Sequence, residues 1–164
     1  ARPRSARIAS RIGLIVLIAI SIGASVQSIP PDREGLEIGE GLGMALPAEL
    51  NGYPGPKHVL ELKDSLSLSP AQEKDVKEFF EEMKSEALAL GEAIISAEEN
   101  LDGAFRSGRI SEDSLRAKSV EIGQLRGQLR AVHLRAHLRT KAVLSPVQIE
   151  KYMRLRGHMK HAHH

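Results

Sequence analysis

One long apolar stripe constrains the fold of this chain more than any other feature of its sequence. From Val76 to Phe105 apolar residues recur at spacings of four and three, and no helix breaker follows before Gly108. This spacing places them on one face of an α-helix, in a heptad-like seam. A helix of about 36 residues rises ~54 Å at 1.5 Å per residue. The sequence therefore predicts one long helix whose seam needs a second helix to cover it.

A second amphipathic run supplies that covering helix. Gly108 stands where a helix C-cap is expected, and Ser111, followed by two acids, has the pattern of a new N-cap. Because only a short turn separates the two runs, we expect them to form an antiparallel hairpin. The seam of the second run comprises Leu115, Ile122, Leu125, Leu129, Val132, Ala136 and Val143. A further stripe, which other elements should cover, comprises Ala131, Leu134, Leu138 and Ala142.

Charge supports this pairing of the two runs. Residues 73–102 carry ten acids and three lysines, a net charge of −7. Residues 106–160 carry thirteen bases and four acids, a net charge of +9. The two arms are therefore opposite in sign, which favours their docking and predicts a dipolar surface.

The same five-residue phrase, Leu-Ser-Pro-x-Gln, occurs at positions 68–72 and again at 144–148. In each copy the serine has the position of an N-cap and the proline that of the first helical residue, where its missing N–H costs nothing. The glutamine three residues after the cap can return to the N–H of the cap, which completes a capping box. Both phrases therefore predict helix starts. Their motif residues are Leu68, Ser69, Gln72, Leu144, Ser145 and Gln148.

These signals divide the chain into four parts. Residues 57–158 are expected to form an all-α domain of four helices, in which a short helix from His58 to Leu66 and a closing helix from Pro146 to about His158 flank the hairpin. Residues 30–56 are rich in Gly and Pro without sustained periodicity, so we interpret them as a mobile linker. Residues 159–164 form a His-rich tail, and residues 1–29 precede the linker.

The N-terminal part has the pattern of an export signal. Four arginines precede an apolar run at 12–24, and small residues follow it. The run suits a cleaved signal peptide, although the uncharged stretch through Ile29 would also permit a signal anchor. In both cases the positive-inside rule places the rest of the chain outside the cytoplasmic membrane, which predicts a periplasmic protein.

Composition argues against several classes of function. The formal net charge is only +2, and two Tyr, three Phe and no Trp leave few stacking platforms, so nucleic acid is not an expected partner. The absence of Cys excludes disulfides and thiolate ligands. No nucleophile, base and orienting residue can be assembled from spacing, so we expect no enzymatic activity.

Histidines provide the candidate binding site. His133 and His137 are separated by four positions, which places both imidazoles on one helix face where they can reach one metal ion. Leu134 occupies the position where a zinc protease has its general base, so that class is excluded. His58 on the short helix is expected to complete the set, with a carboxylate from Glu61, Asp75 or Glu78. Zinc, nickel, cobalt or copper suits such ligands. The alternative is that His133 and His137 are ordinary, partly exposed residues beside the seam and that His58 is an exposed helix residue.

The C-terminal tail is a second candidate for metal binding. Five of the seven positions from His158 to His164 can donate nitrogen or thioether sulfur, and His-rich tracts of this kind often bind metals. The alternative is a solvated tail that binds metal only adventitiously. Its candidate ligands are His158, His161, His163 and His164.

The helix order and the two Leu-Ser-Pro-x-Gln phrases resemble the Spy/CpxP family of periplasmic proteins, with its LTxxQ motif, over residues 55 to about 158. The resemblance implies a hooked all-α hairpin, usually an intertwined homodimer, without enzymatic activity. Members of the family act as ATP-independent chaperones, restrain a stress-sensing kinase, or bind heavy metals as CnrX-like and ZraP-like proteins do. On this sequence the CnrX-like ligand positions fall near His58, Asp75, His133 and His137, whereas Pro54 stands where those sensors have a further histidine.

Taken together, the sequence predicts a dimeric metal-binding envelope-stress protein, active in heavy-metal sensing or resistance. Its partners would be unfolded proteins or a membrane signalling protein. The alternative function is an ATP-independent chaperone that holds unfolded clients on a concave helical surface.

Overall fold

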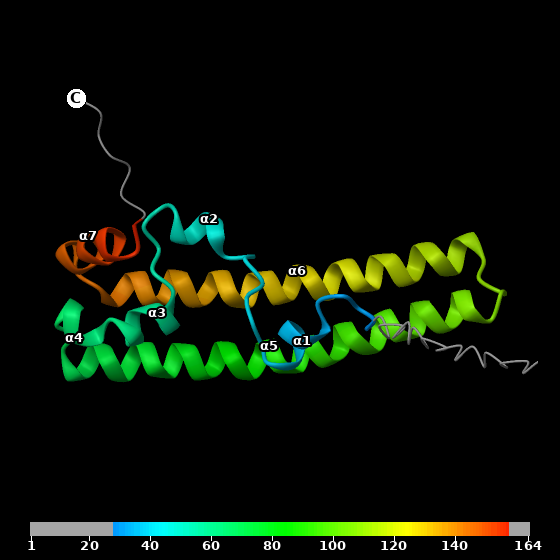
Figure 1. Ribbon diagram of the computed structural model, residues 1–164, viewed down its shortest axis with the longest axis horizontal. Helices are drawn as coiled ribbons and strands as arrows, with labels where there is room; N and C mark the ends of the chain where they lie inside the picture. Colours follow the sequence, from blue (N-terminus) through cyan, green and yellow to red (C-terminus); the bar gives the residue numbers. More distant parts are fainter. Residues whose placement is uncertain (1–27, 158–164) are drawn as a thin grey trace, which may run out of the picture.

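The computed structural model describes residues 28–157, and this part of the chain contains seven helices and no strand (Figure 1). The all-α fold class is therefore as predicted. The expected count of four helices is too low, because the segment before the hairpin contains four short helices where one was predicted. Within the described range, no helix combines the length and apolarity that crossing a membrane requires.

Two long helices form the hairpin (Figure 1). Helix α5 covers Pro70–Arg106 and helix α6 covers Glu112–Val143, and the two pack against each other along their length. Gly108 adopts φ +67° in the connecting turn, a conformation that costs glycine little. The hydroxyl of Ser111 accepts a hydrogen bond from the Ser114 N–H and so caps α6. Both predicted helices and the predicted N-cap Ser111 are confirmed, whereas the C-cap of α5 is Ser107 and Gly108 is the residue that follows it.

The two Leu-Ser-Pro-x-Gln phrases are capping boxes, as predicted, and they also bind each other. Gln72 Nε2 donates to Gln148 Oε1 at 2.9 Å, and Gln148 Nε2 donates to Gln72 Oε1 at 3.0 Å. Each amide also donates to a main-chain carbonyl, that of Val143 at 2.8 Å and that of Leu66 at 3.3 Å respectively. The repeated phrase therefore starts two helices and ties these starts together.

A hydrophobic cluster adjoins this glutamine pair at the end of the hairpin opposite its turn, which we call the closed end because short helices cover it. Helices α3 (Pro56–Glu61), α4 (Lys63–Leu66) and α7 (Pro146–Leu155) pack there beside the start of α5 and the end of α6 (Figure 1). The predicted helix from His58 to Leu66 is thus divided, because Leu62 leaves helical geometry at φ −101°, ψ 12°. Tyr152 of α7 is fully buried and its hydroxyl donates to Glu49 Oε1 at 2.7 Å. The buried members are Val59, Leu66, Val76, Leu144 and Tyr152.

Residues 30–56 contain ordered structure, so their interpretation as a mobile linker is wrong. Helix α1 covers Arg33–Glu37 and helix α2 covers Leu46–Glu49. Leu36 is almost completely buried against α5 and α6, in one cluster with Ala87, Ile94, Ile95 and Leu129. The glycines between α1 and α2 make turns of positive φ, at Gly39 and Gly43, and do not leave the chain without structure.

Helix α1 approaches α5 closely because α5 has a glycine at the contact. A Cβ atom at Gly91 would lie 2.4 Å from the carbonyl oxygen of Leu36. Arg126 of α6 fixes the start of α1, since its guanidinium donates to Asp32 at 2.7 and 3.1 Å and to Glu98 of α5 at 3.0 Å. This bidentate ion pair lowers the pKa of Asp32 and raises that of Arg126.

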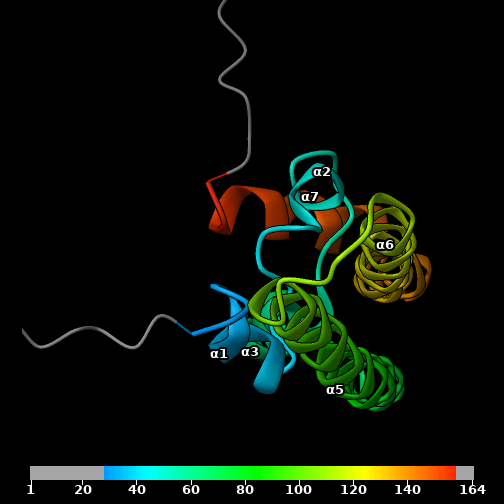
Figure 2. The same ribbon diagram turned by 90° about the vertical axis from the view of Figure 1, so that its right-hand side faces the viewer.

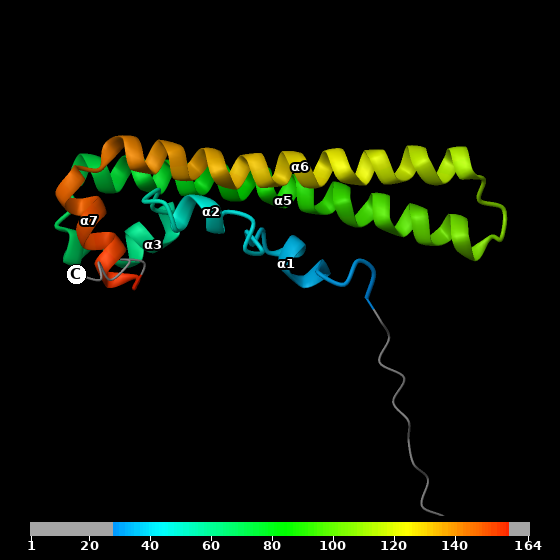
Figure 3. The ribbon, with the colours of Figure 1, turned by 90° about the horizontal axis from the view of Figure 1, so that it is seen from above.

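The short helices all gather on one side of the hairpin. Viewed end-on, α1, α2, α3 and α7 lie to the same side of the α5 and α6 pair (Figure 2). Viewed from above, the opposite side of the hairpin carries none of the described helices (Figure 3). The helices of residues 28–157 therefore cover one side of the hairpin, and the candidate site lies beneath the covering segments.

Candidate functional site

A cavity of about 590 Å³ lies between the hairpin and residues 38–58, a segment that we call the strap. The strap leads from the end of α1 through α2 to the first turns of α3. The strap forms one wall of the cavity, and side chains of α5 and α6 form the other. The hairpin residues that line the cavity are Phe80, Met83, Lys84, His133 and His137.

His137 has a fixed orientation in this cavity. Its Nδ1 lies 2.7 Å from the carbonyl oxygen of Tyr53, and because a carbonyl only accepts, Nδ1 must carry the proton. Lys141 lies over the Tyr53 ring, with Nζ 3.6 Å from the ring centroid, and helps to hold this part of the strap. Gly55 gives the imidazole room, since a Cβ there would lie 2.9 Å from His137 Cε1. The Nε2 lone pair of neutral His137 is therefore left for another partner.

His133 lies one helical turn earlier and is 5% exposed. Its Nε2 is buried and has no hydrogen-bond partner, the one side-chain atom of this kind among residues 28–157. The strap passes close to this ring as well, because a Cβ at Gly41 would lie 3.3 Å from His133 Nδ1. Burial, and to a lesser extent the charge of His137, lowers the pKa of His133. The imidazole is thus neutral at pH 7, and one of its nitrogens has no partner among the described residues.

His58 lines the same cavity from α3 but is engaged elsewhere. Its Nδ1 donates to Glu61 Oε2 at 2.8 Å, and this hydrogen bond lowers the pKa of Glu61. Its Nε2 lies 3.9 Å from Glu49 Oε1, a carboxylate that already accepts from Tyr152. His58 therefore shares the cavity with the α6 histidines while its ring contacts two acids of the strap and α3.

The predicted ligand set is brought together only in part. His58, His133 and His137 line one cavity, whereas Asp75 is not among the lining residues. In the part of the chain that the structure describes, no group of three or more His, Cys, Asp or Glu side chains is placed to hold one metal ion. The physical reason is that the ring of His58 contacts Glu61 and Glu49. The tail ligands His158, His161, His163 and His164 lie outside the described residues, as do residues 1–27 with their export signal.

Sequence reasoning missed the strap residues that shape this site. Tyr53 contributes through its main chain, and Gly41 and Gly55 contribute by lacking a side chain, so none of them has a chemical signature. The glycine density of 39–55 was a usable signal, because glycines are required where main chain passes close to a ring. Lys84 was missed because it belongs to the charged face of a long helix.

The arrangement can bind a ligand through two imidazole nitrogens that lie one turn apart at a covered surface. Comparison of the chain with known protein families, with curated proteins and with solved structures finds no match. The chemistry of the site must therefore be argued from its own geometry.

Proposed function

We propose that this protein is a non-enzymatic, metal-binding stress protein in which His133 and His137 hold one divalent transition metal ion. The observation that carries the proposal is the buried Nε2 of His133, which lacks a partner one helical turn from His137. A metal ion would satisfy this nitrogen, and a buried polar atom without a partner costs free energy comparable to a lost hydrogen bond.

The hydrogen bond from His137 Nδ1 to the Tyr53 carbonyl supports the same function. Metal-binding histidines usually donate their second ring N–H to a carbonyl or carboxylate, which fixes the tautomer and directs the other nitrogen to the metal. Both imidazoles would bind as neutral rings, and their nitrogens suit zinc, nickel, cobalt or copper. The described residues thus offer two ligands, and His58 is the candidate third if it leaves Glu61.

This third ligand would make the protein responsive to metal. His58 is the last residue of the strap and belongs to the first turn of α3. If it binds the ion, it would connect this turn to α6, so that metal binding changes the position of the strap. A metal-dependent change of this kind fits heavy-metal sensing or resistance in the periplasm. The protein would act as a homodimer and would signal to a membrane protein. The Spy/CpxP-like interpretation, with its hooked hairpin, rests on the helix order and on the two Leu-Ser-Pro-x-Gln phrases.

Calorimetric titration tests the proposal. Zinc, nickel, cobalt and copper are titrated into the full chain in which His158, His161, His163 and His164 are replaced by Asn, so that the tail contributes nothing. We expect one site of micromolar affinity or better, which is lost in His133→Ala and in His137→Ala.

Two further variants sharpen that titration. His58→Ala should weaken binding by less than either α6 variant, because it removes only the recruited ligand. Asp75→Asn is the matched control and should leave the affinity unchanged, since Asp75 does not line the cavity. Equal affinity in the parent chain and in His133→Ala would remove the site from the α6 histidines and contradict the proposal.

One observation favours the chaperone function as a second candidate. The strap exposes four large apolar side chains at intervals of four, Ile38, Leu42, Leu46 and Leu50. Exposed apolar patches are typical of surfaces that hold protein partners. If this is the main function, the chain should suppress aggregation of an unfolded client in the presence of EDTA, and the His133→Ala/His137→Ala double variant should do so equally well.

A further inference from the structure

The cavity under the strap is lined by apolar side chains and lysines as well as by the histidines of the proposed metal site. Its hairpin wall includes Phe80 and Met83 of α5, and the strap adds Ile38, Leu42 and Leu46. Two lysines, Lys57 of α3 and Lys84 of α5, also line it. Cavities of several hundred Å³ with apolar walls and a few polar groups are typical sites for small organic ligands.

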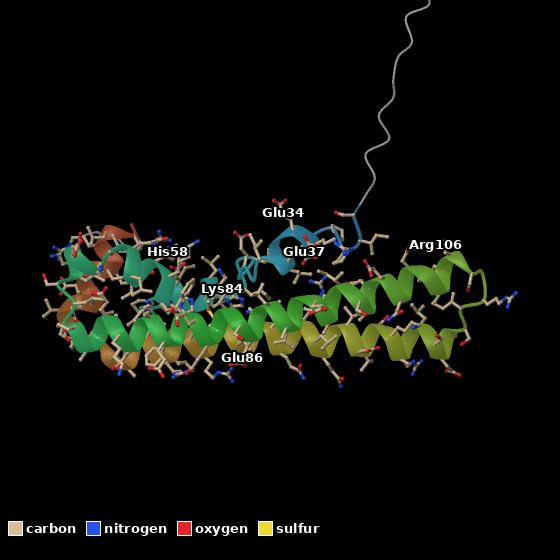
Figure 4. All side chains as sticks on the ribbon, turned by 90° about the horizontal axis from the view of Figure 1, so that it is seen from below. Glu34, Glu37, His58, Lys84, Glu86 and Arg106 are labelled. Carbon is tan, nitrogen blue, oxygen red and sulfur yellow. The ribbon has the colours of Figure 1, made fainter. Side chains whose placement is uncertain are left out.

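The two lysines form no ion pair with the described acids. Within residues 28–157 neither Lys57 nor Lys84 takes part in an ion pair, whereas Lys63 of α4 lies 2.7 Å from Glu73. Figure 4 shows Lys84 on the side of α5 that faces His58 and the covering helices, and Glu86 on the other side. Glu86 belongs to a different contact, an ion pair of 2.6 Å with Arg135 of α6.

Both lysines are exposed, and neither acid of the cavity lining forms an ion pair with them. Outside the lining, the charge of Lys57 helps to lower the pKa of Glu61 on the same helix. Glu49 lines the cavity but is engaged, since it accepts from the Tyr152 hydroxyl and lies 3.7 Å from Arg156. Glu40 is the other acid of the lining and belongs to the exposed part of the strap. Two cations without an ion pair, at a cavity with apolar walls, provide the contacts that an organic anion with an apolar body requires.

We propose that this cavity binds an amphipathic monocarboxylate, whose carboxylate contacts Lys57 and Lys84 and whose apolar body packs against Phe80, Met83 and Leu46. This site goes beyond the proposed metal function and does not depend on it, because its recognition uses the lysines and the apolar wall. The exposed apolar side chains of the strap, Leu42 and Leu46 among them, would lose contact with water when the ligand is bound.

The test uses decanoate as the probe, with decanol as a neutral probe of the same chain length. Both are titrated by calorimetry into the full chain, which has been dialysed against EDTA to remove metal. We expect one saturable decanoate site and at least tenfold weaker binding of decanol. Replacing one lysine, in Lys57→Gln or Lys84→Gln, should weaken decanoate about tenfold, as expected for the loss of one hydrogen bond to a charged group.

Lys77→Gln is the matched control, because Lys77 lies on the same helix as Lys84, is exposed and does not line the cavity. It should bind decanoate as the parent chain does, and circular dichroism checks that all variants are equally folded. The proposal would be overturned if decanoate did not bind, bound only after metal was restored, or bound no more tightly than decanol. It would also be overturned if Lys77→Gln weakened decanoate as much as the cavity lysine variants, or if neither cavity lysine variant weakened it. Metal titration of Lys84→Gln keeps the two proposals apart, since it should match the parent chain.

Discussion

The two ends of the hairpin are built from the same pair of helices and yet are held in different ways. At the closed end, α3, α4 and α7 contribute to a buried cluster, and Gln72 and Gln148 bind each other beside it. At the turn end, which extends beyond the short helices in Figure 1, Phe105 and Val120 are each 54% exposed. The comparison shows that the seam alone leaves large apolar side chains in water, and that burial on this hairpin depends on the segments that cover it.

The glycines of the two ends lead to the same conclusion. Gly91 in the covered part is in close contact with the main chain of α1. Gly103 near the turn end would meet no atom within 4 Å if it carried a Cβ. The same residue type is thus required at position 91, where α1 packs against it, and is not required at position 103, where the space beside it is open.

The largest expected effect is a difference in stability between two aromatic substitutions, one at a buried residue of the closed end and one at an exposed residue of the turn end. Tyr152→Ala should lower the free energy of unfolding by about 3–5 kcal/mol, because it leaves a cavity in the closed-end cluster and removes the partner of Glu49. Phe105→Ala should change the free energy by no more than about 0.5 kcal/mol, since Phe105 is largely in water. Urea unfolding followed by circular dichroism measures both. Similar losses in the two variants would contradict the comparison.

The glutamine pair should have the next largest effect. Gln148→Ala is expected to cost about 1–3 kcal/mol, because it leaves the Gln72 amide and the Leu66 carbonyl without their partner. A double-mutant cycle with Gln72→Ala should give a coupling energy of about 0.5–3 kcal/mol. Gln128→Ala, on the exposed side of α6, serves as the matched control. A coupling energy of zero would mean that the two phrases act only as separate capping boxes.

Alanine at the two glycines should change stability in opposite directions. Gly91→Ala is expected to destabilise the fold by about 1–3 kcal/mol, because its Cβ would collide with the Leu36 carbonyl and displace α1. Gly103→Ala should stabilise it by about 0.5–1 kcal/mol, since alanine is the better helix former and has free space. The pair is compared by thermal unfolding, and the same sign in both would show that α1 does not dock as described.

The smallest expected effect is a pH dependence of the free energy of unfolding that arises from His133, in the part of the hairpin that the strap covers. Burial lowers the pKa of His133, so the unfolded chain takes up this proton at a higher pH than the folded chain. The associated stability is therefore present above the unfolded-state pKa of about 6.5 and is lost as the pH falls through the lower folded pKa. His133→Gln should lose less stability than the parent chain over that range in urea unfolding. Equal pH dependence would indicate that His133 is solvated.

Much of the fold could be predicted from local sequence. The seam from Val76 to Phe105, the turn at Gly108 and the serine caps each act within a few residues, so their patterns are visible in the chain itself. The strap could not be predicted in this way. Helix α1 before the strap and helix α2 within it have five and four residues, too few for a periodic pattern, and Leu36 alone gives α1 its buried contact.

The candidate site divides along the same line. The spacing of His133 and His137 is a local property, so the sequence was enough to place both on one helix face. The contact of His137 with Tyr53 spans 84 positions and uses a main-chain carbonyl. Every residue has such a carbonyl, so the residue type at position 53 does not indicate the contact. Asp75 was expected to join the histidines because it lies early in α5, but proximity to a cavity depends on helix rotation and on what covers the helix.

By itself, the sequence determined that this chain forms a long helical hairpin with two capped helix starts, because helix periodicity and capping are local interactions. Only the tertiary structure decided that the two motif glutamines bind each other, that residues 30–56 fold onto the hairpin, and that the strap encloses His133 and His137. The physical reason is that these features arise from contacts between segments distant in the chain, where a missing side chain or a main-chain carbonyl is the deciding group.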